Sequence, residues 1–105
     1  DFSFGDYQIL NGEVKNCIDK AFSFGEVSKE VVNNIKIYNS NYAIVSKDSS
    51  KVFGQNIYAQ RIKNYCLAAY NKKTEFEGGY LNVKNISCDW KNFKDNNSEI
   101  IINAK

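Results

Sequence analysis

The chain has no histidine, no proline and no methionine, and it has one tryptophan among its 105 residues. Without histidine, neither a Ser-His nor a Cys-His catalytic dyad can form, and the side chain most often used for proton transfer near neutral pH is missing. The usual zinc sites need cysteines and histidines at short spacings, whereas Cys17, Cys66 and Cys88 are far apart in the chain. We therefore expect no enzyme active site, no metal site and no cofactor.

The chain also lacks a strong charge of either sign. Fourteen lysines and arginines face 12 aspartates and glutamates, which leaves a formal net charge of +2, and Arg61 is the only arginine. Nucleic-acid-binding proteins usually carry a basic stripe with several arginines. No segment approaches the roughly 20 consecutive apolar residues of a membrane-spanning helix. We expect neither a nucleic-acid partner nor a membrane span.

The hydrophobic content is that of a folded domain. Of the residues, 43% are hydrophobic and 14% aromatic, and the length suits a single domain over residues 1–105. The sequence starts at Asp1 rather than at a methionine, which suggests a removed leader or a trimmed chain. We expect an exported, periplasmic protein, and such a compartment would allow disulfides to form.

Three segments show apolar residues at helical spacing. The first, over 7–22, follows a capping Asp6; the second covers 27–45; the third, over 51–72, matches the helical pattern best. No internal repeat is evident. These patterns predict an all-α fold, a mainly helical small domain of about four helices. The apolar run "EIIINAK" at the end favours a strand by propensity and a helix only if packing overrides it, so short strands are expected in the last third.

The three cysteines have different surroundings. Cys17 lies within the apolar stripe of the first segment, and Cys66 is most simply a small buried hydrophobe. Cys17 and Cys88 are more attractive partners for a disulfide because both lie beside large apolar residues on different elements. Three single pairings remain open, since spacing alone does not choose among them.

The segment "NKKTEFEGGY", residues 71–80, predicts an exposed loop with aromatic residues. Phe76 and Tyr80 are hard to bury there, and exposed aromatics are favoured at protein–protein contacts. Glu75 and Glu77 could form the carboxylate pair of a glycoside hydrolase, but solvated loop charges explain them more simply.

The order of several stretches resembles a known family. These are "NCIDKAF", "EVSKEVV", "RIKNYCLAAY" and "ISCDWKNF", and the resemblance runs loosely over residues 6–95. The pattern is similar to that of the periplasmic immunity proteins that block type VI secretion amidase effectors. The resemblance implies a small, all-helical, exported domain in which Cys17 and Cys88 form the family's disulfide and Cys66 is additional.

The resemblance also implies a mode of action. Such an immunity protein, typically a homodimer, inserts a protruding element into the active-site groove of a secreted peptidoglycan amidase and has no catalytic residues. On this hypothesis the loop 71–80 is the plug, Phe76 and Tyr80 are its anchors, and Glu75 and Glu77 meet polar or cationic groups of the groove.

Other hypotheses remain open. The chain could be the soluble domain of a minor pilin or another surface structural subunit, which would suit a strand-like tail and a late cysteine. It could inhibit a different secreted target, such as a lysozyme or a protease. The enzyme hypothesis would use Cys66 with a carboxylate partner.

Overall fold

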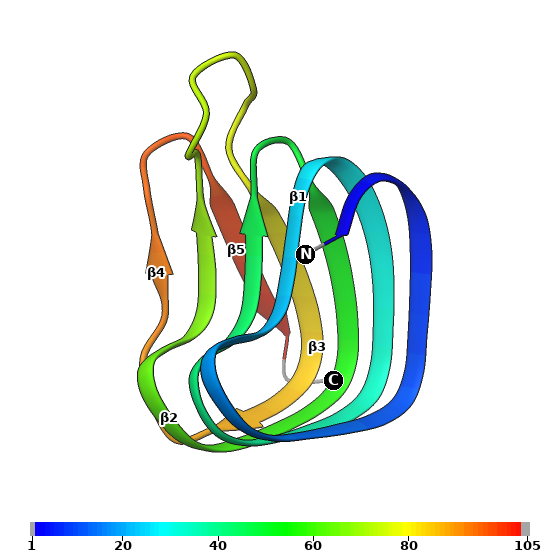
Figure 1. The fold of residues 1–105 in the computed structure, drawn as a ribbon, viewed down its shortest axis with the longest axis vertical. Helices are drawn as coiled ribbons and strands as arrows, with labels where there is room; N and C mark the ends of the chain where they lie inside the picture. The colour runs from blue at the N-terminus through cyan, green and yellow to red at the C-terminus, as the bar shows by residue number, and fades with distance from the viewer. Residues whose placement is uncertain (1, 104–105) are drawn as a thin grey trace.

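The computed structural model describes residues 2–103, and every regular element in that range is a strand. The strands pair in parallel, in the order β1-β2-β3-β5, and β4 pairs with β2. The chain winds into a parallel β-solenoid (Figure 1). Since the described residues form no helix, none of them provides a helical membrane span. The strands are β1 (Phe2–Lys47), β2 (Lys51–Tyr70), β3 (Tyr80–Cys88), β4 (Phe93–Lys94) and β5 (Glu99–Asn103).

The prediction of an all-α domain is therefore wrong. Only the strands expected in the last third are confirmed, and "EIIIN" is β5. The apolar positions of the second segment do not share one face, because Val27 is 51% exposed and Val31 40% exposed, whereas Ile35 is buried. In a solenoid, bends in the chain make the inward-facing residues recur at irregular steps of two and three. Such a spacing can resemble the apolar stripe of a helix.

The first three coils repeat at 22 to 23 residues, whereas Ile57 of the third coil and Ile86 of the fourth are 29 residues apart, because a loop separates β2 from β3. β1 forms a first coil (residues 2–24) and a second coil (25–47), β2 forms the third, and β3 with β4 forms the fourth. Ile35 pairs with Ile57 of β2, which pairs with Ile86 of β3. The chain thus contains an internal repeat that our sequence interpretation missed.

Asparagine makes the same bend in each coil. Asn11, Asn34, Asn56 and Asn85 have φ angles between 57° and 61°. Asparagine tolerates this left-handed conformation better than most residues, so it can turn the strand without glycine. Their amides also join neighbouring coils: Asn34 donates to Asn11 at 2.8 Å, and Asn85 donates to Asn56 at 2.6 Å.

The core lies inside the coils and is formed by side chains stacked from one coil to the next. Val52 and Leu81 occupy one such stack and are fully buried. Glu30 of the second coil is paired with Val52, is also fully buried, and neither of its carboxylate oxygens has a hydrogen-bond partner within the described residues. Burial raises the pKa of Glu30 to about 7.

Two glycines allow the chain to re-enter the solenoid before β3. A Cβ atom at Gly79 would lie 1.9 Å from the carbonyl oxygen of Ser46, and one at Gly78 would lie 2.1 Å from that of Asn97. No larger residue fits these positions without moving the backbone. The loop 71–79 between β2 and β3 projects from the edge of the solenoid, at the turn from the third coil into the fourth (Figure 1).

Candidate ligand-binding surface

A disulfide joins the third and fourth coils. Cys66 and Cys88 are bonded, with their Cα atoms 6.3 Å apart, and Cys17 is a free, half-buried thiol. The predicted Cys17–Cys88 pairing is therefore wrong, because Cys17 lies in the first coil and Cys88 in the fourth, with two coils between them. Cys66 is buried, as expected of a core residue, but it is not a free thiol.

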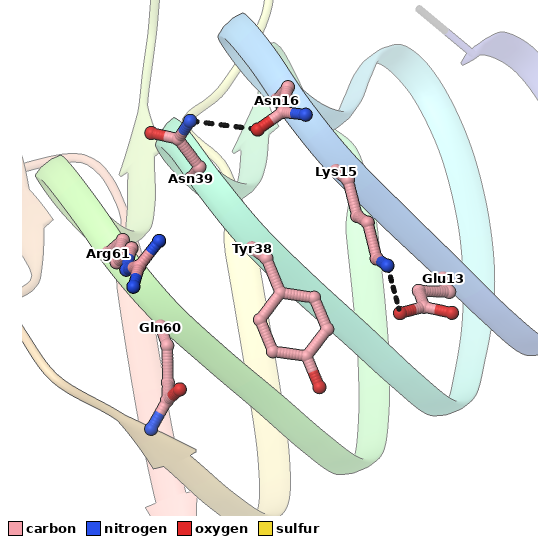
Figure 2. A pocket seen from close by; sticks show the side chains of 7 residues that line it. All are labelled: Glu13, Lys15, Asn16, Tyr38, Asn39, Gln60 and Arg61. Carbon is pink, nitrogen blue, oxygen red and sulfur yellow. Dashed lines mark hydrogen bonds and ion pairs between the residues drawn. The ribbon is translucent and has the colours of Figure 1, made fainter.

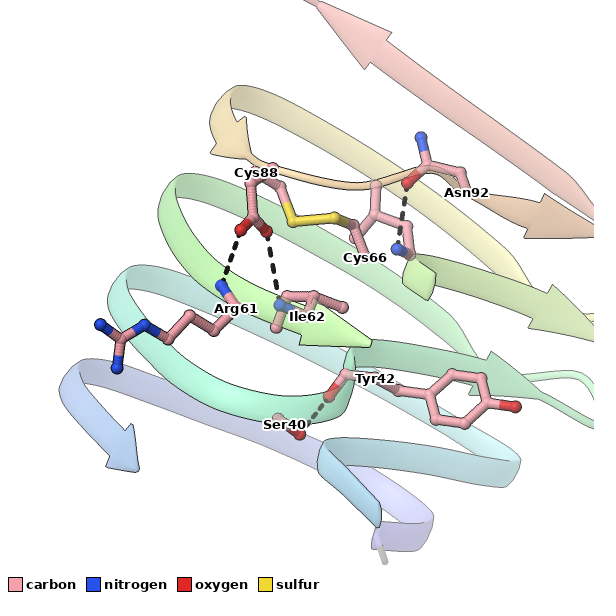
Figure 3. The surroundings of a disulfide bond; sticks show 9 residues. Ser40, Tyr42, Arg61, Ile62, Cys66, Cys88 and Asn92 are labelled. Atoms are coloured by element: carbon pink, nitrogen blue, oxygen red, sulfur yellow. Dashed lines mark hydrogen bonds between the residues drawn. A yellow bond between two sulfur atoms is a disulfide. The ribbon is translucent and has the colours of Figure 1, made fainter. Parts of the chain in front are cut away.

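The disulfide lies at a corner where the fourth coil is shorter than the third. Ala59 of β2 pairs with Cys88 of β3, and Ala68 of β2 pairs with Phe93 of β4. Residues 60–67 of β2 therefore lie beside only four residues of the fourth coil, 89–92. Side chains replace the missing strand bonds here (Figure 3). The Asp89 carboxylate accepts from the backbone N–H groups of Arg61 and Ile62, at 2.8 and 3.4 Å. Because its oxygens bond the backbone and both cysteines are oxidised, the Cys66–Cys88–Asp89 cluster does not suit a metal ion.

The four predicted partner-binding residues do not lie on one common surface. Glu75 and Glu77 are exposed on the projecting loop. The Phe76 ring packs edge-on against Phe4 at 6.4 Å, and Tyr80 is the first residue of β3, where its ring lies 5.8 Å from Phe53. Phe76 and Tyr80 therefore contribute to the fold and do not form a common exposed tip.

The loop is held to the solenoid at its base. Asp48 accepts hydrogen bonds from the backbone N–H groups of Lys72 and Lys73, at 2.7 and 2.8 Å. Lys73 also forms an ion pair with Glu26 of β1, and this bond lowers the pKa of Glu26 and raises that of Lys73. The backbone of the loop base is thus fixed, while the carboxylates of Glu75 and Glu77 face solvent.

An open groove on the surface crosses three coils at a second bend (Figure 2). It has a volume of about 420 Å³. Asn16, Asn39 and Arg61 make the bend in successive coils, each with a φ angle near +60°, at 57°, 59° and 59°. We call this the lateral groove. Its lining residues are Glu13, Lys15, Asn16, Tyr38, Asn39, Gln60 and Arg61.

The lateral groove offers hydrogen-bonding groups of several kinds. Asn39 donates to Asn16 at 2.8 Å, and Lys15 pairs with Glu13 at 3.6 Å. Tyr38 pairs in register with Gln60, so a phenol and an amide lie side by side on adjacent coils. Our sequence interpretation gave none of these residues a binding role. The recurrence of asparagine at residues 16 and 39, one coil apart, was the signal that could have indicated them.

A second surface is aromatic and basic, and it lies at the disulfide corner. The ring centroids of Tyr42 and Tyr65 are 6.0 Å apart, and those of Tyr65 and Phe93 are 5.3 Å apart, which makes an aromatic row across three coils. Trp90 is 52% exposed beside this row. The ammonium group of Lys91 lies 5.4 Å from the centroid of the Trp90 ring and 5.9 Å from that of Tyr65.

A scan against protein-family models and searches of curated proteins and of solved structures found no match to this chain. These comparisons neither support nor refute the resemblance to amidase-effector immunity proteins. The helical fold that this resemblance implies is nevertheless wrong, so the function has to be argued from the surface of the solenoid.

Proposed function

We propose that this chain is a non-catalytic, exported binding domain that holds a neutral oligosaccharide in the lateral groove. One observation carries the proposal: polar side chains from three successive coils line one open groove. Parallel strands lie about 4.8 Å apart, so the coils present their side chains at regular intervals. An extended ligand with repeated hydroxyl groups can contact each coil in turn.

The chemistry of the lining supports a sugar ligand. Hydroxyl groups both donate and accept hydrogen bonds, and the groove supplies amides, a carboxylate, an ammonium and a guanidinium that match both roles. The Tyr38 ring adds a flat apolar surface for the C–H face of a sugar, with a polar hydroxyl at its end.

Two features support binding without turnover, outside the cytoplasm. Glycoside hydrolysis generally needs two carboxylates flanking the bond, and the described residues that line the groove include one, Glu13, which is already paired with Lys15. The Cys66–Cys88 disulfide is compatible with an oxidising compartment such as the periplasm.

The test uses a panel of neutral tetrasaccharides: chitotetraose, cellotetraose, laminaritetraose and maltotetraose. Isothermal titration should show saturable binding of at least one of them without release of shorter sugars. Tyr38→Ala and Gln60→Ala should each weaken that binding by about tenfold, which is about 1.4 kcal/mol. Gln55→Ala is the matched control, because Gln55 is an exposed glutamine of the same strand outside the groove.

Two results would contradict this proposal. One is the failure of the whole panel to bind the folded protein. The other is that Tyr38→Ala and Gln60→Ala bind the sugar as strongly as the control Gln55→Ala. The ligand would then lie outside the lateral groove.

A second candidate function is the inhibitor role predicted from the sequence, with a secreted amidase as partner. The observation in its favour is the projection of loop 71–79 with Glu75 and Glu77 exposed. The test is capture of a purified peptidoglycan amidase and inhibition of its activity. A Glu75→Ala/Glu77→Ala variant should lose inhibition, and unchanged inhibition would reject the loop as the plug.

A further inference from the structure

The disulfide corner forms a groove of its own. Because the fourth coil crosses this corner with fewer residues than the third, residues 63–65 of β2 extend past it. The groove between them has a volume of about 320 Å³ and is separate from the lateral groove. We call it the corner groove. It is lined by Lys63, Asn64, Tyr65, Trp90 and Lys91.

The backbone of the corner groove is fixed on both sides. Cys66 follows the lining residues 63–65 and Cys88 comes shortly before Trp90, so the disulfide ties the two sides together. The backbone N–H of Cys66 donates to the carbonyl of Lys91 at 2.7 Å. The backbone N–H of Leu67 donates to the Asn92 side chain at 3.1 Å (Figure 3). A rigid backbone holds the side chains of residues 90 and 91 outward, so little order has to be imposed when a ligand binds.

The exposed groups in this groove are unusual for a structural corner. Trp90 is the only tryptophan of the chain, and half of its surface faces solvent. Lys63 and Lys91 are exposed, and neither forms an ion pair within residues 2–103. The nearest carboxylate in sequence, Asp89, is engaged by two backbone N–H groups. The Lys91 ammonium lies near the Trp90 and Tyr65 rings, but neither it nor the Lys63 ammonium is neutralised by a carboxylate in these residues. An aromatic face beside two such cations favours a ligand that is flat on one side and anionic.

We propose that the corner groove is a second binding site, specific for an acidic saccharide. A sugar ring stacks on Trp90, and its carboxylate or sulfate pairs with Lys63 and Lys91. Phe93, 41% exposed and next to Tyr65 in the aromatic row, gives a neighbouring sugar a second platform. The low net charge of +2 and the single arginine favour a sugar over a nucleic acid.

The site is distinct from the lateral groove, so each proposal can fail without the other. Trp90 reports on binding directly, because the intrinsic tryptophan fluorescence of this chain comes from this residue alone. The probe is trigalacturonic acid, and galactotriose, which lacks the carboxylates, is the matched neutral ligand. We expect a saturable change in emission with trigalacturonic acid that weakens as salt is added, and binding of galactotriose at least about tenfold weaker.

Variants separate the corner groove from other surfaces. Lys63→Ala/Lys91→Ala should weaken trigalacturonic acid binding by about tenfold or more, because two charges facing the ligand are lost. Lys29→Ala/Lys84→Ala, which removes two exposed lysines elsewhere, and Gln60→Ala in the lateral groove should leave it unchanged. All of these positions are exposed, and circular dichroism checks that each variant keeps the wild-type fold.

Four outcomes would overturn the proposal. The first is the absence of a saturable emission change, and the second is binding of galactotriose as tight as that of trigalacturonic acid. The third is that Lys63→Ala/Lys91→Ala binds trigalacturonic acid as tightly as the control pair does. The fourth is binding of a single-stranded oligonucleotide or of anionic phosphatidylglycerol vesicles that is tighter than binding of trigalacturonic acid. The last would assign the same lysines and tryptophan to a different class of partner.

Discussion

The side-chain nitrogen of Asn34 donates a hydrogen bond of 2.8 Å to Oδ1 of Asn11, which lies 23 residues earlier and one coil away. Both residues have left-handed φ angles, 60° and 57°. Asn56 and Asn85 repeat this geometry farther along the solenoid. Each asparagine therefore bends its own coil through its backbone and joins a neighbouring coil through its side chain.

The first prediction concerns this asparagine column. Asn56→Ala should lower the free energy of unfolding by about 2 kcal/mol, because alanine is strained in the left-handed conformation and loses the amide bonds to Asn33 and Asn85. Asn56→Gly should lower it less, since glycine adopts that conformation freely. Urea unfolding measures both, with Gln55→Ala as an exposed neighbouring control. Equal stability of Asn56→Ala and Gln55→Ala would show that the column does not stabilise the fold.

The second prediction concerns the disulfide. Closing a loop with a separation of 22 residues should stabilise the protein by about 3 kcal/mol in the chain-entropy model, so Cys66→Ala/Cys88→Ala should unfold at a clearly lower urea concentration. Cys17→Ser should change stability little and leave the disulfide intact. Peptide mapping without reductant should recover Cys66 linked to Cys88. A linked peptide containing Cys17 would contradict the structure.

The third prediction concerns pH. Burial raises the pKa of Glu30 from its ordinary value of 4.5 to about 7. Below pH 4.5 the carboxyl group is protonated in both states; as pH rises from there to 7, the unfolded chain releases the proton while the folded chain retains it. Stability should therefore fall over this range by about 3 kcal/mol and then stay level.

Glu30→Gln isolates this effect, because glutamine stays neutral. The stability difference between wild type and this variant should change in the variant's favour from pH 4.5 to 7, as measured by urea unfolding at each pH. Glu75→Gln, at an exposed position, is the control and should show no such trend. A difference for Glu30→Gln that is constant with pH would mean that Glu30 is not held protonated.

The fourth prediction concerns Gly79. A methyl group there would lie 1.9 Å from the Ser46 carbonyl oxygen, so Gly79→Ala should destabilise the protein by about 2 kcal/mol or more, or reduce its soluble yield. Gly54→Ala is the control, because its Cβ would meet Val83 at an ordinary 3.4 Å. Thermal unfolding compares the two. Similar melting temperatures would indicate that the backbone before β3 moves easily.

Several features of this fold could be predicted from the sequence. The three isoleucines of β5 follow β propensity, the loop after Tyr70 was expected from its polar residues and glycines, and Cys88 was expected in a disulfide. These features are local, or depend on residue type alone.

The solenoid itself could not be predicted in this way, because it depends on how residues of different coils align. Buried residues of the second coil, such as Val32, Ile35 and Ile37, are separated by steps of three and two, because each asparagine bend shifts the inside–outside alternation. The repeated pair Asn-Ile, at residues 34–35, 56–57 and 85–86, carried the repeat in the sequence. Its unequal spacing conceals it, since the inserted loop 71–79 lengthens the last interval.

The candidate sites were missed for the same reason. Tyr38 and Gln60 become neighbours only when the coils stack, and so do Tyr65 and Trp90. Before the coils are aligned, their side chains are isolated polar or aromatic residues.

The most direct test of the binding role is an amide ¹⁵N NMR titration with the neutral tetrasaccharide that binds best in the panel. Saturable shifts should concentrate at Asn16, Asn39 and Gln60, which line the lateral groove, with the sugar recovered intact. Shifts confined to loop 71–79 or to the far face, no shifts at all, or cleavage of the sugar would contradict the account.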